Sequence, residues 1–596
     1  MKMWMKYIFW LGVAIGIFLR FYNLRYTTEF TFDQEHYLAF PAKQILIDHH
    51  LTAIGAKTGV GDLFVGPLYT YLGALFFWLF RMDPVAGVYL SAVLASLTLV
   101  AAYLLIKKTH NSYTALIFIA FWSISPFVLV FDRTPININL LSLSTLFTVS
   151  GLQLSLKRKT WWGGILVGLG FFLGINSHFT SVFLIFGALI ILGVNRKTIG
   201  MISFLFSLLG LVFGFLPLAV FDFKHGFLIT HNLMKFIFES SGGSLFPVRL
   251  WHIGLTIGET IGRLFLYDGP QWLQQSLGIC IVALLVHASR KWSKSSKHLV
   301  VFLLVYWVGF SLYKGSTPDY YFLGLLIIVC LEIAFWVAGL LNQKNYFLGI
   351  LIIALILLWQ GWSKIHQPLP KSLGVKQEIV KAVKNRADDT PIVLKYDIEY
   401  GWQEGFEYLL YYYGLHLSDD ASSLYLVSFP SNRFPGKPDI TIGDMAVGYP
   451  ETVAKILSTK EVRLYNVLST RIPKNWSILS CPYVDFDTYL LTPDASASCS
   501  RLASIREGFI VAHLPECSIW EMSGVKGLDL GIRSSFPLIK VAASKVHYAP
   551  VSSDFQLIAT AFERQRCFVF ADLKKPQLEP LSDEMLDLIS SLKQVH

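Results

Sequence analysis

A short stretch near the start of the chain, FTFDQEHYLAF (residues 30–40), places acidic side chains and an imidazole among aromatic residues. Asp33, Glu35 and His36 follow the first long apolar segment, where a membrane helix would leave the bilayer. A carboxylate placed there can act as a general base on an acceptor hydroxyl. Asp33 and Glu35 are two positions apart and do not share one helix face, so one can face a cavity while the other does something else. Ordinary surface acids in a hydrated loop are the alternative interpretation.

Four further groups of polar residues stand at the ends of other apolar segments. A histidine at such an end is more often an interfacial residue than a ligand. The four groups therefore indicate a functional site only if all of them lie at one face of a membrane. Together they would line a pocket with an acid, several cations and aromatic walls. Such a pocket suits a lipid-linked phosphosugar, because the cations bind phosphate and the aromatic walls stack on the sugar or the lipid. The groups are Asp132 with Arg133, Asn176 with His178, Asp222 with Lys224 and His225, and Asp319 with Tyr320 and Tyr321.

The composition identifies the class of protein that must position these groups. Of 596 residues, 54% are hydrophobic and only 15% are charged, and the mean hydropathy is +0.52. These values are typical of a polytopic α-helical membrane protein and exclude a soluble globular chain of this size. The net charge of +10 is interpreted as a membrane-topology signal, so no nucleic-acid partner is expected.

About eleven segments are apolar and long enough to cross a bilayer. A twelfth, residues 67–81, is shorter and aromatic, and we predict that it is a juxtamembrane helix lying in the interface. With this assignment and a cytoplasmic N-terminus, the inner segments carry fourteen basic residues and no acidic one; if residues 67–81 crossed, that asymmetry would collapse. The predicted spans are 5–22, 84–106, 113–131, 138–156, 161–175, 179–194, 198–220, 272–290, 298–313, 320–341 and 346–363.

This topology describes a multi-pass protein of the cell membrane with its polar groups on one side. The N-terminus is cytoplasmic, and residues 23–83, 221–271 and everything after 364 are extracytoplasmic. A transporter carries ionisable groups near mid-membrane, whereas Glu332 is the main such residue here. The pattern favours chemistry at the outer face over a conduit.

The chain after the last span changes character. Residues 1–364 are predicted as the membrane-embedded domain and residues 365–460 as a small α/β extracytoplasmic domain. Residues 461–596 form an additional C-terminal region of unknown function, richer in predicted strands and ending in a predicted helix over 582–595. Four cysteines in this region either form disulfides on the outer side or remain free thiols; they are Cys481, Cys499, Cys517 and Cys567.

Six stretches, taken in order, resemble the GT-C superfamily of membrane glycosyltransferases, in the branch of the protein O-mannosyltransferases and the lipid A aminoarabinose transferases. The similar features extend over about residues 1–365. They are FTFDQEH, GPLYTYLGALFFWLF, SPFVLVFDR, LGFFLGINSHFTSVFL, LPLAVFDFKHGFLITHNL and PDYYFLGLL.

The resemblance implies an inverting transfer of a sugar from a polyprenyl-phosphate donor to a lipid, glycan or protein acceptor at the outer face, among membrane lipids. Asp33 matches the catalytic acid of the family, and Glu35 stands one position later than the second acid of an Asp-Glu pair. Some enzymes of this kind use a divalent metal, but these two acids are too few to assign a metal site. The resemblance implies a phosphate-binding role for Arg133, His178, Lys224 and His225, beside Asp222, and contacts to sugar or lipid for Tyr320 and Tyr321.

Three other functions remain open on the sequence. A polysaccharide polymerase or ligase would also face outward, with larger arginine-rich outer loops. A lipid or sugar transporter (flippase) would place functional polar residues in mid-membrane. In a membrane-anchored binding protein, the C-terminal region would bind the partner and the acids would be solvated surface.

Overall fold

The computed structural model describes residues 3–457, apart from short gaps, and only the strands of the chain beyond 460. Two compact units make up the chain. The first comprises Met1–Gln377 and Glu407–Tyr412, and the second comprises Glu378–Phe406 and Tyr413–His596. The gaps are 60–62, 159–160, 240–245, 292–295, 314, 316, 341–346, 389, 399–401, 419–420, 422 and 435–436.

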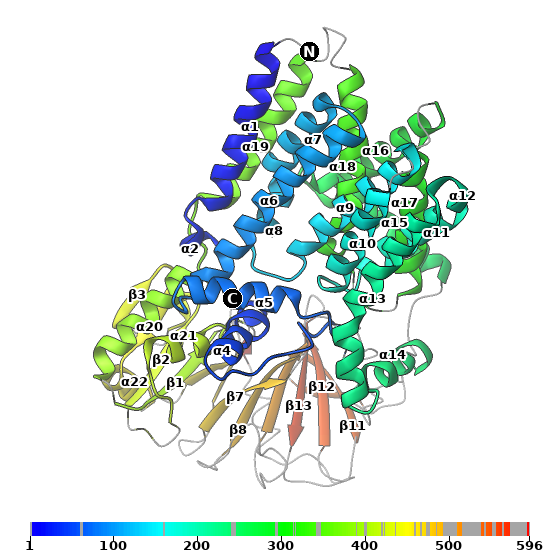
Figure 1. Cartoon of the computed structure of the whole chain (residues 1–596). Coiled ribbons are helices and arrows are strands. Elements are labelled where there is room, and N and C mark those ends of the chain that lie inside the picture. The colour runs from blue at the N-terminus through cyan, green and yellow to red at the C-terminus, as the bar shows by residue number, and fades with distance from the viewer. Residues whose placement is uncertain are drawn as a thin grey trace. The chain divides into compact units, whose positions relative to one another are not determined.

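Helices occupy all eleven predicted spans in the first unit (Figure 1). The fold class predicted from composition is therefore confirmed: the chain is a helical multi-pass membrane protein. The helices are α1 (Met3–Phe21), α6 (Val85–Thr109), α7 (Ser112–Ile124) with α8 (Pro126–Arg133), α9 (Asn139–Arg158), α10 (Trp161–Ile175), α11 (Ser181–Val194), α13 (Met201–Lys224), α16 (Gln271–Lys291), α17 (Ser296–Leu312), α18 (Leu323–Leu340) and α19 (Phe347–Ile365).

Length and composition separate these helices into two groups. Within the described residues, five helices are long and apolar enough to cross a membrane, and α7 with α8 counts as a sixth if a bent pair is one span. The other predicted spans are shorter apolar helices of 10–17 residues. α5 (Leu68–Leu79), from the segment predicted to lie in the interface, is the shortest of these with 12 residues.

A sharp bend divides the predicted span 113–131. α7 and α8 meet at 70° because Ser125 precedes Pro126 and takes an extended conformation, with ψ of 124°. A residue before proline avoids the helical region, and proline has no N–H to continue the helix. The bend turns α8 out of the α7 direction, so that the chain leaves it at Arg133 and runs along the pocket described below.

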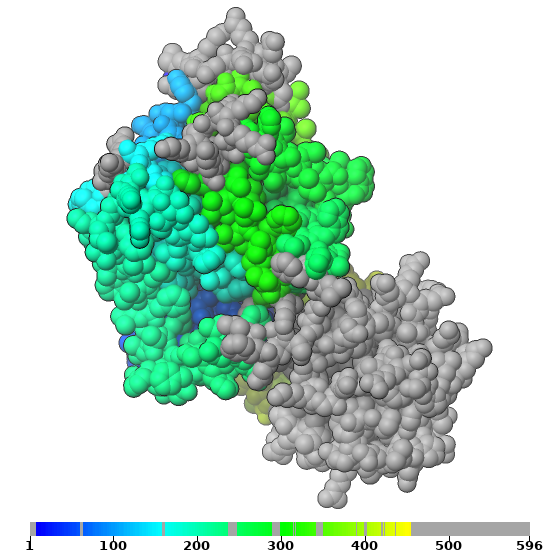
Figure 2. Space-filling model, turned by 90° about the vertical axis from the view of Figure 1, so that its right-hand side faces the viewer, coloured from blue at the N-terminus to red at the C-terminus, as the bar shows by residue number. Residues whose placement is uncertain are grey.

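The segment that follows α1 is built from short helices rather than one loop. It contains α2 (Leu24–Thr27), α3 (Phe32–Gln34), a π-helical turn η1 (Glu35–Ala39) and α4 (Phe40–Leu46). The turn that carries Asp33 begins with a capping box, in which the Gln34 side chain accepts hydrogen bonds from the Thr31 N–H and hydroxyl, both at 2.8 Å. Figure 2 shows one face of the molecule, where N-terminal residues (blue) are visible at the bottom of a recess between teal and green elements.

The segment 221–271, predicted to be extracytoplasmic, contains two helices that were not predicted. They are α14 (Leu228–Glu239) and α15 (Phe246–Arg263). α15 packs closely along α16, where Gly262 and Gly278 face the neighbouring backbone, and a Cβ at either position would meet a carbonyl oxygen within 2.0 Å. Small residues at such a crossing let two helices approach one another.

The chain from 373 to 457 contains the α/β pattern predicted for residues after 365. Its sheet has the order β1-β2-β4-β3, with β1 parallel to β2 and the other pairs antiparallel. Among its described residues, three α-helices accompany the strands. The elements are α20 (Leu373–Ala387), β1 (Ile392–Asp397), α21 (Phe406–Tyr413), β2 (Ser423–Ser428), β3 (Ile440–Ile442), β4 (Met445–Gly448) and α22 (Pro450–Leu457).

The division by contacts places residues 365–377 and 407–412 with the membrane helices, while the boundaries predicted at 364 and 460 stay predictions. Beyond 460 the described strands form a seven-stranded antiparallel sheet and a three-stranded sheet. Residues 582–592 of the predicted C-terminal helix lie outside the described chain, and Lys593–Gln594 is instead a short strand paired with Leu468–Ser469. The side chains of the four C-terminal cysteines are not described.

Candidate functional site

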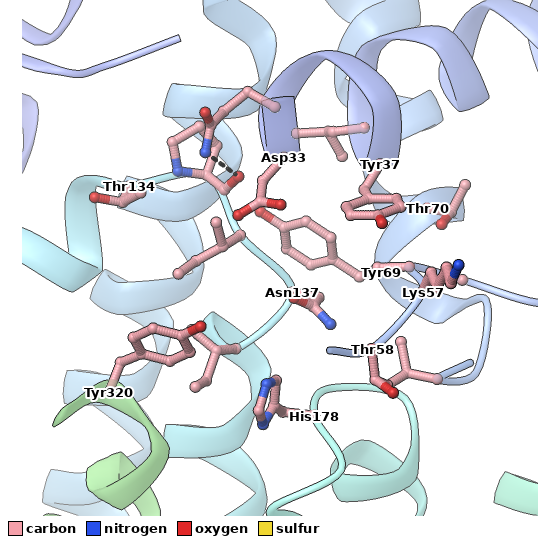
Figure 3. Close-up of a pocket in the computed structure, with 18 of the residues that line it drawn as sticks. Asp33, Tyr37, Lys57, Thr58, Tyr69, Thr70, Thr134, Asn137, His178 and Tyr320 are labelled. Carbon is pink, nitrogen blue, oxygen red and sulfur yellow. Dashed lines mark hydrogen bonds between the residues drawn. The ribbon is translucent and has the colours of Figure 1, made fainter. Parts of the chain in front are cut away.

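A cavity of about 350 Å³ lies in the first unit, beside the segment that follows α1 (Figure 3). Its walls come from α3 and η1, from residues 55–70, from the chain after α8, and from the ends of α10 and α18. Most of these segments were assigned to the outer face by the charge pattern. The polar and aromatic residues of its lining are Glu29, Thr31, Asp33, Gln34, Tyr37, Lys57, Thr58, Tyr69, Thr70, Phe131, Thr134, Asn137, His178, Tyr320 and Tyr321.

Asp33 is the acid that faces this cavity. Its carboxylate points into the space between Tyr69, Tyr320 and the chain at Asn137 (Figure 3), and the side chain keeps an exposed surface there. The surrounding walls restrict hydration, so burial raises the pKa of Asp33 above its ordinary value. The charge of Asp33 also contributes to a raised pKa of Tyr37, after burial. A carboxylate with a raised pKa is a stronger base than a freely hydrated one.

Lys57 supplies the only lysine or arginine among the described residues that line the cavity. It lies on a loop closed by two hydrogen bonds, from Gly55 N–H to the Val65 carbonyl at 2.8 Å and from Val65 N–H to the Ala56 carbonyl at 3.1 Å. The loop is fixed to the end of α10, where the Asn176 side chain accepts from the Leu68 N–H at 3.1 Å. Lys57 was not predicted from the sequence, because a single lysine in a glycine-rich loop belongs to no recognisable motif.

His178 also faces the cavity, as predicted, but as a neutral side chain. Burial lowers the pKa of His178 to about 3, because a charged imidazole loses hydration there. Its Nδ1 lies 3.1 Å from the Thr180 hydroxyl and accepts from the Thr180 N–H at 3.4 Å. The proton therefore resides on Nε2, and His178 can donate a hydrogen bond but cannot supply the positive charge that was predicted for it.

Tyr320 and Tyr321 form the aromatic wall opposite Asp33. Their rings lie 6.0 and 4.8 Å from the His178 ring, and 4.9 Å from one another. The turn that carries them is fixed by Asp319, which pairs with Arg263 of α15. Asp319 is thus a structural residue, whereas the two predicted tyrosines lie in the site.

Glu35 points away from the cavity. Its side chain is buried, and it accepts a hydrogen bond of 2.6 Å from the Tyr408 N–H of α21. Glu35, a catalytic candidate on the sequence together with Asp33, therefore does not face the cavity. The π-helical turn at Glu35 separates the two carboxylates, as their spacing of two positions allowed.

Arg133 is enclosed by the protein. Its guanidinium donates to the carbonyls of Leu19 and Tyr22, the latter at 2.8 Å, and to the Thr27 hydroxyl. Its neighbour Asp132 pairs with Arg20 of α1. These contacts join α8 to the end of α1, so the predicted phosphate contact of Arg133 does not fit the structure.

The remaining predicted group lies at the end of α13 and does not line the cavity. Asp222 accepts hydrogen bonds from the Ile229 and Thr230 N–H groups, at 2.6 and 3.2 Å, and from the Thr230 hydroxyl. It is therefore a cap for the first turn of α14. Lys224 and His225 are exposed there, and the His225 ring stacks on Phe221 at 3.9 Å.

A divalent metal stays a prediction for this site. Asp33 and Glu29 are the carboxylates among the described lining residues, and Glu29 is paired with Lys371 at 2.9 Å. Hard cations require several oxygen ligands, and Glu35 is not among the residues that line the cavity.

Comparison with known proteins finds a family model that matches part of the chain. Residues 65–221 match the family model described as dolichyl-phosphate-mannose-protein mannosyltransferase. That segment begins at the end of the Lys57 loop and carries α5, the chain after α8, and His178. The predicted resemblance to the protein O-mannosyltransferases is confirmed over these residues. A search of curated proteins finds no match.

Solved structures with a similar chain path are distant in sequence. ArnT from Cupriavidus metallidurans, bound to undecaprenyl phosphate, is 9% identical, with a TM-score of 0.48, and the match covers 74% of this chain and 97% of ArnT. The Archaeoglobus fulgidus oligosaccharyltransferase, in complex with Zn and sulfate, is 13% identical, with a TM-score of 0.42, and the coverage is 71% and 67%. Arabinofuranosyltransferase AftD from Mycobacteria is 11% identical, with a TM-score of 0.35, and the coverage is 81% and 40%.

Proposed function

We propose that this chain transfers a sugar from a polyprenyl-phosphate donor to an acceptor hydroxyl in the cavity described above, with Asp33 as the general base. The observation that carries the proposal is the direction of the Asp33 carboxylate, which faces the open cavity (Figure 3) while Glu35 binds the protein. The match to a family named for a dolichyl-phosphate-linked sugar supports the donor class.

The reaction would break one bond and form another at the anomeric carbon. Asp33 takes the proton of the acceptor hydroxyl as its oxygen attacks, and the bond from the anomeric carbon to the phosphate oxygen breaks on the opposite side. The configuration inverts, and polyprenyl phosphate leaves with the bonding electrons. Lys57 is placed to stabilise the charge of the phosphate, and neutral His178 donates a hydrogen bond from Nε2. Tyr320 and Tyr321 would contact the sugar or the first isoprene units.

The proposed orientation is an N-terminus in the cytoplasm and a pocket open to the outer side. It rests on the basic residues of the predicted inner segments and on the pocket walls, most of which come from predicted outer segments. The acceptor, whether lipid, glycan or protein, would then reach the site from outside the cell membrane.

Transport of a lipid or sugar is less well supported. Glu332, which the sequence singled out as an ionisable residue within a span, is largely buried and interacts electrostatically with Lys157 at the end of α9. A largely buried acid beside a lysine fits a role in helix packing better than one in a transport path. A polymerase or ligase remains the alternative enzyme and would use the same base with a growing glycan as the acceptor.

The test is release of polyprenyl phosphate by the purified protein in lipid nanodiscs, with polyprenyl-phosphate hexoses and pentoses as donors. We expect turnover by the wild type and its loss in Asp33→Asn. Asp48→Asn is the matched control, because Asp48 pairs with Lys43 on the surface and does not line the cavity. No turnover with any donor, together with movement of lipid or sugar across vesicles, would favour the transporter; equal loss in both variants would remove Asp33 as the base.

A further inference from the structure

The segment that carries Asp33 is bound by parts of the chain more than three hundred residues away. Residues 26–40, here called the strap, include α3 and η1 and pass along the cavity. The first partner segment is 369–377, and the second is 407–412; both belong to the same compact unit as the strap.

The first partner segment pairs with the start of the strap through its backbone. Leu369 N–H donates to the Tyr26 carbonyl at 2.8 Å, and Leu373 N–H donates to the Thr28 carbonyl at 3.0 Å. A third bond comes from a side chain: Lys376 is fully buried, and its ammonium donates to the Phe30 carbonyl at 2.7 Å. Burying an ammonium group costs free energy unless the group is well hydrogen-bonded. The buried Lys376 therefore indicates a fixed contact.

The second partner segment binds the strap on the other side of Asp33. Tyr408 lies in the first turn of α21, where backbone N–H groups have no partner within the helix. Its N–H donates to the carboxylate of Glu35, which is fully buried. Glu35 thus caps α21 from 373 residues earlier in the chain, and the positive end of the helix dipole favours its negative charge.

The side chain of Tyr408 adds an apolar anchor at the same point. Its ring packs against Phe30, Phe40 and Phe77 at centroid distances of 5.5–6.4 Å. Its hydroxyl donates to the Met82 carbonyl at 2.9 Å. The strap is therefore bonded at Phe30 and at Glu35, three residues before Asp33 and two residues after it.

We propose that Glu35 is a positioning residue, which holds the Asp33 turn toward the cavity by capping α21, and that Lys376 holds the other end of the same turn. The proposal rests on the proposed function insofar as Asp33 is the base. It gives Glu35, the buried acid of the FTFDQEH stretch, a structural role. It also makes the two partner segments, which follow the last span, part of the catalytic apparatus.

Hydrogen exchange of the strap peptide tests the contact independently of catalysis, in the purified full-length chain. Glu35→Ala removes the acceptor, and we expect amides in 26–40 to exchange about tenfold to a hundredfold faster, the ratio that loss of one charge-assisted hydrogen bond gives. Glu35→Gln keeps an acceptor oxygen and should restore most of the protection. Glu407→Ala is the control, because Glu407 is the exposed neighbour of Tyr408. If Glu35→Ala does not fold, Lys376→Met tests the other end, with the same expected rise in exchange.

Turnover measured on the same variants separates positioning from catalysis. We expect Glu35→Ala to lower kcat with little change in donor KM, and Glu35→Gln to retain most of kcat with an unchanged pH profile. Unchanged exchange in Glu35→Ala and in Lys376→Met would overturn the proposal. A Glu35→Gln variant with wild-type exchange but no turnover would also overturn it, since Glu35 would then be catalytic. A wild-type chain inactive with every donor would refute the proposed function alone, while the exchange result would still decide the contact.

Discussion

Two groups of charges lie near the ends of the membrane helices, and the structure uses them differently. Asp33 and Lys57 face a cavity. Arg20, Asp132 and Arg133 lie between α1 and α8, and each binds protein atoms: Arg20 donates to Asp132 and to the Gly16 and Ser123 carbonyls at 2.9 and 2.8 Å. The difference shows that a charge beside a bilayer is a functional candidate when its surroundings leave space for a substrate. Where protein groups fill that space, the same residue types join helices.

The largest expected effect comes from the cavity group. Asp33→Asn should lower turnover roughly 10²- to 10⁴-fold, the usual contribution of a general base, with no loss of thermal stability, because the side chain faces open space. In the wild type, the acidic limb of the pH–rate profile should follow the raised pKa of Asp33, and activity should fall as pH drops through it. The measurement is polyprenyl phosphate release against pH, with thermal unfolding in parallel. A variant that unfolds early would place Asp33 with the structural group.

The second effect comes from the helix-joining group and should be opposite in kind. Asp132→Asn removes the charge that pairs with Arg20, whose side chain is fully buried. Leaving a buried charge without its partner costs about 3–5 kcal/mol, so the midpoint of thermal unfolding in detergent should fall markedly. Activity per folded molecule should change little. Wild-type stability with lost turnover would contradict the comparison.

The third effect concerns the cation of the cavity. Lys57→Met keeps the aliphatic stem and removes the charge, so donor binding should weaken by about tenfold to a hundredfold, the equivalent of one charge-assisted hydrogen bond. The donor KM should rise, and inhibition by added polyprenyl phosphate should weaken in parallel. Lys224→Met is the matched control, because Lys224 is exposed and does not line the cavity. Equal effects of both variants would show that the surface charge as a whole, rather than Lys57, attracts the phosphate.

The smallest effect is a pH dependence of stability caused by His178. The folded chain holds this pKa at about 3, while an unfolded histidine titrates near 6.5. Between these two pKa values the unfolded state binds a proton that the folded state does not bind. The free energy of unfolding therefore falls as pH drops below about 6.5. His178→Gln should reduce this slope, as measured by unfolding between pH 7 and pH 5. An unchanged slope would mean that His178 takes up its proton in the folded state.

The helices were predictable because the apolar composition of each span is enough to identify it. The site was predictable only where a residue faces the cavity for local reasons: Asp33 lies within a capping box, and His178, Tyr320 and Tyr321 stand at helix ends that converge. Arg133 could not be assigned, since its partners Leu19, in α1, and Tyr22, directly after α1, lie more than a hundred residues earlier. Lys57 was missed although it lines the cavity, because its position depends on the contact of its loop with Asn176, which is distant in sequence.

The cap that Glu35 provides for α21 has a consequence for how the protein is made. The strap leaves the insertion machinery early, just after α1, but its partners at 369–377 and at Tyr408 are synthesised after every predicted span. The Asp33 turn therefore cannot form its hydrogen bonds to these partners until all predicted membrane spans have been synthesised. Maturation of the site is in this way tied to completed insertion, so that a nascent chain halted within the membrane domain would carry the base but not the contacts that aim it.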